Sequence, residues 1–380
     1  MPAREPRTAL MRIMVTLPWG ERLGGAEAMI QEIFDGAAQL GHELEPVFFN
    51  DGPWRAELAA AGMRTEAIDA GRLRDPLRYA TAVRRLAALI RGRNPDLILN
   101  WAAKTQIYGS PAARLAGAGA GDRVVWFQQN VPDGFWLDRL ATLLPARAVC
   151  CYSAAAKEAQ QKMWPVRDTY AVAAGAKPAP DAELPATIEL PADVPVVGLV
   201  GRLQPWKGQD RMLRAQALLR ARGVEMHQLV VGGDAYGLSA EYAAWLPELA
   251  RELGIADAVT FTGQVPDAGP YIRRMDVLVN ASDPEPFGIV LLEAMARGVA
   301  TMAVDSGGPG EFVRDGETGM LARSGSPEDL ANALEPLLAS AQLRSRCAEA
   351  GAEAFRAEFT DVALRRRFFA RMEQIAGGAS

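Results

Sequence analysis

Apolar residues in the first half of this chain form short runs that alternate with longer amphipathic segments. The runs predict strands at Met11–Leu17, Leu44–Phe49, Leu97–Trp101, Arg123–Gln128 and Ala148–Tyr152. Apolar residues at helical spacing predict helices that include Ala26–Leu40, Leu77–Arg91 and Ala154–Met163. Buried strands that alternate with amphipathic helices are typical of βαβ units, so the sequence predicts an α/β fold with a parallel sheet.

The same pattern starts again after a stretch, residues 177–195, that has five prolines and little periodicity. Further strands are predicted at Val196–Val200, Leu229–Val231, Val259–Thr262, Val277–Asn280 and Ala300–Val304. Helices are predicted at Gln209–Ala221, Leu330–Leu338, Leu343–Phe355 and Asp361–Ile375. We therefore expect one α/β domain at 1–176, a linker at 177–195, a second α/β domain at 196–355 and a C-terminal helix at 356–380.

Composition narrows the functional classes. The chain has 380 residues, enough for two domains, and its net charge of −5 argues against general nucleic-acid binding. Its three cysteines form no disulfide framework, which fits a reducing cytosol. No apolar stretch approaches a membrane-spanning helix or a signal-peptide core, so a cytoplasmic protein is expected. Residues Met1–Thr8 are predicted to be a disordered tail.

Two glutamates eight positions apart, Glu285 and Glu293, mark the segment with the clearest candidate chemistry. Pro286 disfavours helix at the residue before it, so Glu285 is predicted to lie in a loop. A lone acidic loop of this kind is usually only a turn. Glu293 lies within an apolar run, where a carboxylate needs a partner; the alternatives are a ligand hydroxyl and a buried helix salt bridge.

The residues between the two glutamates predict an anion site. Gly288 allows the backbone to approach a ligand closely, and the pattern becomes helical after it. The amide groups of Phe287, Gly288 and Ile289 would then be unpaired donors at a helix N-terminus. Glu293 follows Ile289 by four residues and shares its helix face, where its carboxylate could accept two hydroxyl hydrogen bonds from a ribose.

Two cations, Arg202 and Lys207, follow the predicted strand Val196–Val200. Ligands of open α/β sheets bind beyond the carboxyl ends of the strands, so both cations are expected at a cleft. A departing nucleoside diphosphate needs such charges as its glycosidic bond breaks. Alone they would be read as solvated surface cations, but the Glu285 segment downstream favours the functional interpretation.

The run from Glu285 to Glu293 resembles the E-x7-E motif of retaining GT-B glycosyltransferases of family 4. Other segments match in the family's order: Gly24–Glu27, Gly201–Gly208, Asp305–Glu311 and Asp315–Gly319. The resemblance implies a GT-B fold of two Rossmann-like domains that face an interdomain cleft, with the final helix returning to the N-terminal domain. It implies transfer of a sugar, with retention, from a UDP- or GDP-linked donor to an acceptor hydroxyl.

The resemblance also assigns roles to residues. It places Glu285 beside the transferred sugar, where it would position hydroxyls and support the transition state electrostatically. It places Gly25 in a loop that faces the donor phosphates or the acceptor, although a tight strand-to-helix turn is an equal explanation. The backbone around Val265 would contact the nucleobase. Many relatives carry a histidine beside the sugar, and here Gln128 replaces it; glutamine can donate hydrogen bonds but cannot take up a proton.

Several alternatives and absences bear on this interpretation. No Asp-x-Asp sequence or metal-ligand spacing occurs, so neither a metal nor a cofactor is expected, and Arg202, Lys207 and helix amides must stabilise the leaving group. A sugar-nucleotide epimerase or hydrolase on the same fold would need acid/base groups at the sugar. A non-catalytic sugar-nucleotide-binding protein is the other alternative, and Gln128 is the residue that favours it.

The predicted helix at Leu77–Arg91 is unusually basic. Residues 72–93 contain seven arginines opposed only by Asp75. Such a face is more often simply solvated, but it could rest on anionic lipid at the inner face of the membrane. Membrane contact would suit a lipid-linked or polysaccharide glycan as the acceptor.

Overall fold

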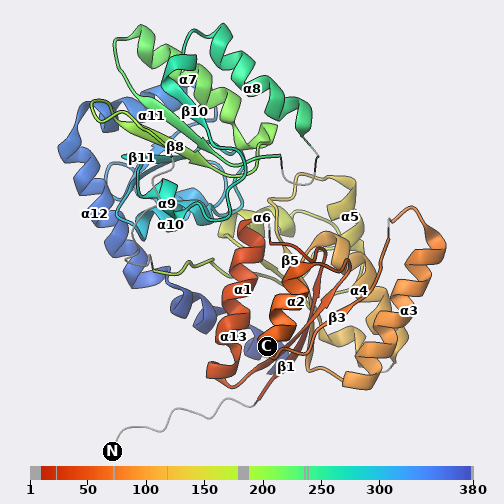
Figure 1. The fold of residues 1–380 in the computed structure, drawn as a ribbon. Helices are drawn as coiled ribbons and strands as arrows, with labels where there is room; N and C mark the ends of the chain where they lie inside the picture. The colour runs from red at the N-terminus through yellow and green to blue at the C-terminus, as the bar shows by residue number, and fades with distance from the viewer. Residues whose placement is uncertain are drawn as a thin grey trace, which may run out of the picture. The chain divides into compact units, whose positions relative to one another are not determined.

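The computed structural model describes residues 10–22, 24–71, 73–117, 119–178, 188–234, 237 and 239–377. The predicted tail Met1–Thr8 and residues 179–187 of the predicted linker lie outside the described residues. The chain forms two compact units: unit 1 consists of Met1–Ala173 with Leu364–Ser380, and unit 2 of Ala174–Ala363. The end of the chain therefore belongs to unit 1, although it follows unit 2 in sequence (Figure 1).

Unit 1 contains a seven-stranded sheet in the order β3-β2-β1-β4-β5-β6-β7. Every neighbouring pair is parallel, as the alternating pattern predicted. The strands are β1 (Arg12–Leu17), β2 (Glu43–Phe48), β3 (Glu66–Ala67), β4 (Leu97–Asn100), β5 (Val124–Gln128), β6 (Ala148–Cys151) and β7 (Thr169–Ala171).

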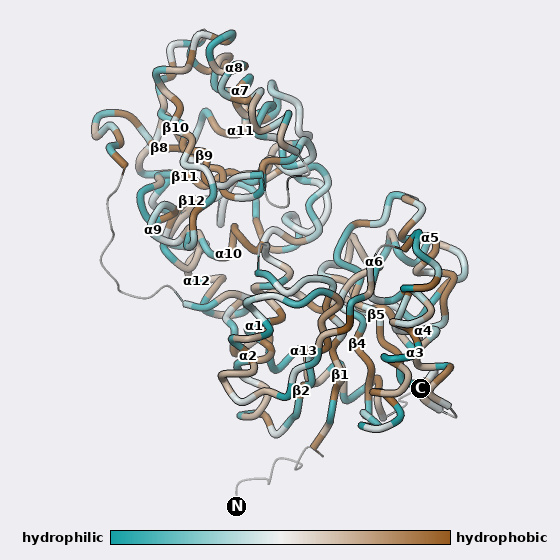
Figure 2. Tube along the Cα trace, turned by 45° about the vertical axis from the view of Figure 1, so that its right-hand side comes forward, coloured by the Kyte–Doolittle hydropathy of each residue, from teal (hydrophilic) through white to brown (hydrophobic). Residues whose placement is uncertain are grey.

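Helices cover both faces of this sheet. They are α1 (Gly25–Ala37), α2 (Pro53–Ala60), α3 (Pro76–Arg93), α4 (Ala103–Ala116), α5 (Trp136–Leu143), α6 (Ala154–Gln161) and α13 (Asp361–Gly377). α3 and α4 bury Leu86 and Tyr108 against Met14 and Ile98 of the central strands. Figure 2 shows hydrophobic residues concentrated on central strands such as β1 and β4, which fits strands buried on both faces.

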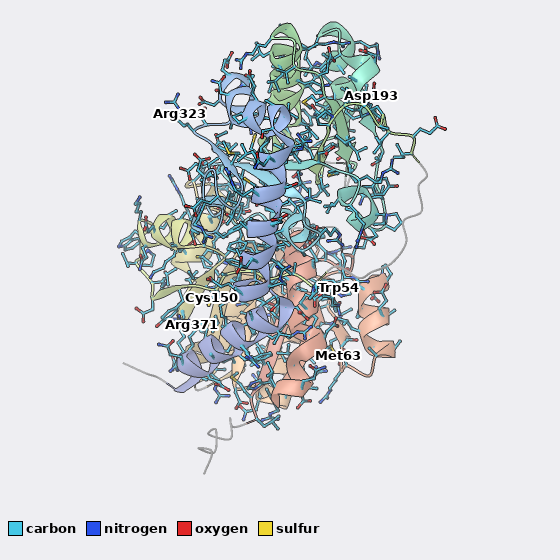
Figure 3. The ribbon with its side chains drawn as sticks, turned by 90° about the vertical axis from the view of Figure 1, so that its left-hand side faces the viewer. Trp54, Met63, Cys150, Asp193, Arg323 and Arg371 are labelled. Carbon is cyan, nitrogen blue, oxygen red and sulfur yellow. The ribbon has the colours of Figure 1, made fainter. Side chains whose placement is uncertain are left out.

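The last helix, α13, packs within unit 1. Arg365 donates to the carbonyl oxygen of Glu32 in α1 at 2.7 Å. The guanidinium of Arg371 lies 4.4 Å from the ring centroid of Tyr170 in β7. Figure 3 shows Arg371 beside Cys150. Burial raises the pKa of the Cys150 thiol, and the positive charge of Arg371 partly opposes that rise. These contacts attach α13 to α1 and to the β6–β7 side of the sheet.

Unit 2 contains a six-stranded parallel sheet in the order β10-β9-β8-β11-β12-β13. The strands are β8 (Val196–Val200), β9 (His227–Val231), β10 (Val259–Phe261), β11 (Val277–Asn280), β12 (Ala300–Val304) and β13 (Met320–Ala322). The helices are α7 (Gln209–Ala221), α8 (Ala240–Glu252), α9 (Gly269–Ile272), α10 (Ile289–Met295), α11 (Pro327–Ala339) and α12 (Ala341–Glu358).

Strand β8 contributes to the hydrophobic core of unit 2. α7, α11 and α12 bury Met212, Leu334 and Cys347 against Val197 and Leu199 of this strand. Residues two apart on a strand face the same side, so the alternate positions of β8 anchor one helical layer. Among the described residues, no helix is both long and apolar enough to cross a membrane.

Candidate active site

The strand order of unit 2 creates a topological switch point. β8 lies between β9 and β11, so the chain leaves β8 toward one edge of the sheet and later leaves β11 toward the other. Ligands of doubly wound sheets bind outside the carboxyl ends of the strands at such a point. The two loops that meet there are 201–208, which follows β8, and 281–288, which follows β11.

These two loops are in close contact. Gly208 adopts a left-handed φ of 74°, and a Cβ at this position would lie 2.5 Å from the carbonyl oxygen of Ala281. A larger residue would push the loops apart, which explains the glycine. Arg211 holds the same region by donating to the carbonyl oxygens of Ala281 at 2.7 Å and Trp206 at 3.3 Å.

Lys207 and Glu285, one from each loop, form an ion pair. The distance from Lys207 Nζ to Glu285 Oε2 is 2.8 Å, and Asn280 Nδ2 donates to the same oxygen at 3.2 Å. Lys207 Nζ also lies 3.9 Å from the ring centroid of Trp206. The two side chains are 21% and 9% exposed, so the pair is mostly withdrawn from water.

The surroundings of Glu285 keep it ionised. Burial alone raises the pKa of this carboxyl, but the Lys207 ammonium and its hydrogen bond lower it. Hydrogen bonds from Ser282 and Asn280 act in the same direction, and the net pKa of Glu285 lies below its ordinary value. The site therefore holds a carboxylate and an ammonium at neutral pH.

The backbone of Glu285 is fixed as firmly as its side chain. Its amide donates to the carbonyl oxygen of Ser306 at 2.9 Å, and its carbonyl oxygen accepts from the Gly308 amide at 2.8 Å. Gly307, at φ 98°, passes so close to the Glu285 carbonyl that a Cβ would clash. The segment Asp305–Glu311 thus serves to hold Glu285 in place after β12.

The residues that follow Glu285 offer backbone groups only. The Phe287 side chain is buried and stacks on Phe312, with ring centroids 5.0 Å apart. Gly288 adopts φ 96° and caps α10. Within the described part of the chain, the amides of Gly288 and Ile289 donate to no protein acceptor. α10 has seven residues, so these amides add local donors and little helix dipole.

Glu293 lies on α10 with a carboxylate that accepts no hydrogen bond from any described residue; only its backbone carbonyl is bonded, by Arg297 at 2.8 Å. Burial raises the pKa of Glu293 to about 7, with Arg297 opposing and Asp267 reinforcing that shift. Asp267 belongs to the loop after β10 that also carries Val265. This loop is therefore close enough to α10 for the charge of Asp267 to act on the Glu293 carboxyl.

The cationic side chain of Arg202 has no partner among the described residues. Its backbone carbonyl accepts from Gln209 Nε2 at 2.9 Å, but its guanidinium forms no hydrogen bond or ion pair with the described residues. It shares the loop after β8 with Lys207. Among the described residues, no three His, Cys, Asp or Glu side chains gather as metal ligands.

Gln128 and Gly25 belong to unit 1, at the end of β5 and at the start of α1. Gly25 is the first residue of α1, with Gly24 as its extended N-cap. Gln128 ends β5, is 1% exposed and accepts from the Asn130 amide at 3.3 Å. Its Nε2 has no acceptor in good hydrogen-bonding geometry, but a hydrogen bond with Gln128 lowers the pKa of the Asp138 carboxyl of α5. A buried amide at the carboxyl end of a parallel strand, with part of its hydrogen-bonding capacity unused, is suited to a ligand hydroxyl.

Two models of known families match the chain. The model described as "Glycosyl transferase 4-like domain" matches residues 24–163, and the model described as "Glycosyl transferases group 1" matches residues 181–354. Together they cover most of both units. The chain belongs to the group 1 family of glycosyltransferases. The family resemblance of the Glu285–Glu293 segment is thereby confirmed.

Curated relatives of this glycosyltransferase fall into two kinds. The D-inositol 3-phosphate glycosyltransferase of Stackebrandtia nassauensis is 44% identical over 178 residues, which is 45% of this chain and only 40% of that relative. The lipopolysaccharide core biosynthesis glycosyltransferase LpsE of Rhizobium meliloti is 28% identical over 345 residues, 90% of this chain and 93% of LpsE.

Solved structures share the whole fold. Anabaena HepE in complex with UDP and glucose superposes with a TM-score of 0.78 at 23% identity, over 95% of this chain and 99% of HepE. Sucrose-phosphate synthase from Thermosynechococcus elongatus gives 0.79 at 22% identity, over 97% and 100%. At these identities the likeness shows the fold, and it confirms the predicted GT-B architecture of two Rossmann-like units.

Sequence reasoning missed two residues at these sites. Asn280, the polar last residue of the otherwise apolar strand β11, donates to Glu285, and its position was a signal that could have been used. Asp138 of α5 is 4% exposed; burial raises its pKa, and the nearby Gln128 amide partly opposes that rise. Nothing in the sequence around Asp138 indicates burial, because its helix is apolar on the opposite side.

We expect Gln128→Ala to lower kcat of the glycosyltransferase about ten- to hundredfold, because it removes a buried donor at the ligand end of β5. The donor KM should change little, since the main donor-binding candidates belong to unit 2 and Gln128 belongs to unit 1. Gln160→Ala is the matched control: Gln160 is equally buried but donates to Thr142 within the protein at 3.1 Å. It should reduce stability and preserve kcat. A kcat of Gln128→Ala equal to that of the unaltered protein would show that Gln128 is not part of the active site.

Proposed function

We propose that this glycosyltransferase moves a hexose from a UDP- or GDP-linked donor to an acceptor hydroxyl, with retention of the anomeric configuration. The observation that carries the proposal is the Lys207–Glu285 pair at the switch point of unit 2. A mostly buried, fixed ion pair is costly for stability, and it shares its two loops and the following helix with an unpaired guanidinium, Arg202, and an unbonded carboxylate, Glu293. This set of groups is suited to a charged, polyhydroxylated ligand.

The diphosphate of the donor would lie against Arg202 and Lys207. An ammonium has three donors, and Lys207 gives one to Glu285, which leaves two for phosphate oxygens. The Arg202 guanidinium supplies a planar pair of donors that suits a phosphate. The free amides of Gly288 and Ile289 complete the set. These groups would stabilise the negative charge that grows on the leaving diphosphate.

The two glutamates would hold the two sugars of the donor. The Glu285 carboxylate is ionised, so it can accept hydroxyl hydrogen bonds from the transferred hexose and stabilise positive charge at its anomeric carbon. The unbonded Glu293 carboxylate would accept the ribose hydroxyls. Backbone groups near Val265, across from Glu293, would then contact the base.

Retention requires attack from the face that the leaving group departs from. The bond between the anomeric carbon and the diphosphate oxygen breaks, the acceptor oxygen bonds to the same carbon, and the acceptor proton passes to the departing phosphate oxygen. No protein base is needed for this transfer. Gln128 can hydrogen-bond the sugar or the acceptor but cannot carry the proton.

The acceptor proposal follows the relatives. LpsE, matched over most of its length, is named for lipopolysaccharide core biosynthesis, and the inositol phosphate enzymes are matched over less than half of theirs. We therefore propose a glycan acceptor, either lipid-linked or part of a polysaccharide, in preference to a small cyclitol phosphate. A lipid-linked acceptor would place the reaction at the inner face of a membrane.

A thermal-shift screen of nucleoside diphosphates and sugar nucleotides tests donor binding. A ligand that binds only the folded state at about a hundred times its Kd adds about 2.7 kcal/mol to the free energy of unfolding. We expect a UDP or GDP compound to raise Tm by a few degrees, and adenosine diphosphate to have a smaller effect. The absence of any shift with all uridine and guanosine compounds would contradict the proposal.

Product analysis separates transfer from the second candidate, a donor-binding protein without turnover, which Gln128 in place of the histidine of many relatives favours. With donor and a lipid-linked glycan, we expect a new glycoside whose anomeric configuration equals that of the donor. Donor binding with no transfer to any glycan would favour the second candidate, and release of free sugar without acceptor would indicate a hydrolase.

A further inference from the structure

Helix α5 of unit 1 turns its apolar face outward. Trp136, Leu140 and Leu143, spaced along one helix face, are 56%, 37% and 50% exposed. The opposite face buries Asp138 and Thr142, which are 4% and 1% exposed. A surface helix of a globular protein normally shows the reverse arrangement. This inverted arrangement indicates that the exposed face of α5 is suited to contact an apolar environment as well as water.

A second segment extends this apolar face. Arg167 donates to the carbonyl oxygens of Leu143 and Leu144 at 3.4 Å, so the chain after α6 lies against the end of α5. This segment exposes Trp164 by 78% and Val166 by 69%. Phe135, just before α5, is 54% exposed and its ring lies 5.8 Å from that of Trp136. We call these six residues the α5 surface: Phe135, Trp136, Leu140, Leu143, Trp164 and Val166.

The basic helix α3 is linked to α5 through α4, which contacts both helices. Leu73, just before α3, and Tyr79 in its first turns pack in the same hydrophobic cluster as Ala141 on the buried side of α5. Figure 1 shows α3, α4 and α5 as successive helices of unit 1. The α5 surface itself carries a cation, because Arg139 lies on the exposed side of α5.

The arginines of α3 differ in what they contact. Arg91 donates to the carbonyl oxygens of Leu115 and Ala116, and Arg93 pairs with Glu45 at 2.9 Å. Arg91 and Arg93 therefore have partners within the protein, and only other arginines of this segment are available to a lipid surface. Arg72 lies outside the described residues. Three arginines in this region are exposed and form no ion pair with described residues: Arg74, Arg84 and Arg85.

We propose that the α5 surface docks this protein on an anionic phospholipid bilayer, with Arg139 and the free arginines of α3 facing the lipid phosphates. Trp and Phe favour the boundary between headgroups and acyl chains, and leucines on the same helix face reach the hydrocarbon. Each free arginine near the membrane adds electrostatic attraction. This inference does not depend on the proposed reaction.

A bilayer fits the surface better than a second copy of the chain. A symmetric dimer would place the same patch on both partners. It would thus bring two sets of arginines against each other, and the exposed carboxylates next to the α5 surface, Asp133 and Asp168, are fewer than Arg74, Arg84, Arg85 and Arg139. A bilayer offers phosphates to the arginines and a depth gradient of polarity that matches Trp beside Leu.

Vesicle co-sedimentation tests the proposal. The full chain is mixed with vesicles of phosphatidylglycerol and phosphatidylcholine, or of phosphatidylcholine alone. We expect binding to the anionic vesicles that the triple variant Trp136→Ser/Leu140→Ser/Trp164→Ser weakens by about tenfold or more. All three side chains are exposed, so folding should be preserved. Arg84→Ser/Arg85→Ser should weaken binding severalfold and reduce its dependence on salt.

Trp245→Ser on α8 of unit 2 is the matched control, since Trp245 is also partly exposed, at 37%. It should leave vesicle binding unchanged. Equal vesicle binding by the triple variant and the unaltered protein would overturn the proposal. So would a dimer in sedimentation velocity, without vesicles, that the triple variant dissociates, because the surface would then bind a second copy. Transfer to a soluble glycan should persist in the triple variant, which separates this test from that of the reaction.

Discussion

Lys207→Ala is expected to lower transfer activity by about a hundred- to thousandfold, because it removes a cation aimed at the leaving diphosphate. It should also destabilise the free protein by about 3 kcal/mol, because it leaves the buried Glu285 carboxylate without its ionic partner. The two losses have different causes. Initial rates at saturating donor measure the first, and urea unfolding without ligand measures the second.

A double variant separates these causes. Lys207→Met/Glu285→Gln removes both charges and keeps the approximate volumes, so most of the lost stability should return while activity stays low. Arg220→Ala serves as the control: it deletes the pair with Asp257, whose side chains are 35% and 66% exposed, and should cost less than about 1 kcal/mol. Recovery of activity in the double variant would contradict the role of Lys207.

Glu293→Gln is expected to act in opposite directions on stability and on donor binding. Loss of a charged acceptor for the ribose hydroxyls should weaken UDP or GDP binding about ten- to hundredfold. In the free protein the same change should be stabilising at about pH 8, because a glutamine does not bear the cost of burying an unbonded carboxylate. Calorimetric titration and urea unfolding measure the two effects.

The raised pKa of Glu293 determines the pH range in which Glu293→Gln should be stabilising. The pKa of Glu293 rises from 4.5 to about 7 in the folded protein, so between these values the folded state binds more protons than the unfolded state. The contribution of Glu293 to stability is therefore present at low pH and is lost as pH rises through about 7. The gain from Glu293→Gln should be absent near pH 4 and reach about 3 kcal/mol at most near pH 8. Donor binding to the unaltered protein should weaken below about pH 7, as the carboxylate protonates.

Glu335→Gln, on the surface of α11, is the control and should change neither donor affinity nor the pH at which it weakens. An unaltered donor affinity in Glu293→Gln would remove Glu293 from the ribose site. A gain in stability that is the same at low and high pH would show that burial of the charged form is not its cause.

The fold was largely predictable because each long apolar run had one explanation. Val196–Val200 and Ala300–Val304 are buried strands in the structure with the predicted bounds. The short strands β3, β7 and β13 have two or three residues, too few to show a period. α4 escaped prediction because it contains Pro111 and is buried on most sides, so its sequence has no clear polar face.

The candidate site was predictable where neighbours in sequence are also neighbours in space. Glu285, Gly288 and Glu293 lie in one segment, and its turn and helix follow from local rules. The contact of Lys207 with Glu285 joins loops 78 residues apart, and it could be expected only from the order of strands in the sheet. The pairing of Asn280 with Glu285 depends on side-chain direction at a strand end, which residue type alone does not give.

The α5 surface could not be predicted, because an apolar face is read from sequence as a buried face. By that rule Trp136, Leu140 and Leu143 would lie inside and Asp138 outside. Their arrangement is reversed in the structure. Only the packing of α5 against its neighbours shows which side of the helix faces the core. An apolar face that contacts lipid is also removed from water, as a buried face is.

A crystal structure of the protein with bound UDP or GDP, whichever gives the larger thermal shift, tests the central claim most directly. We expect the ribose hydroxyls to lie about 3 Å from the Glu293 carboxylate and phosphate oxygens to lie at similar distances from Lys207 Nζ and the Arg202 guanidinium. A nucleotide bound elsewhere, with Glu293 and Lys207 both out of contact, would contradict the assignment of the donor site.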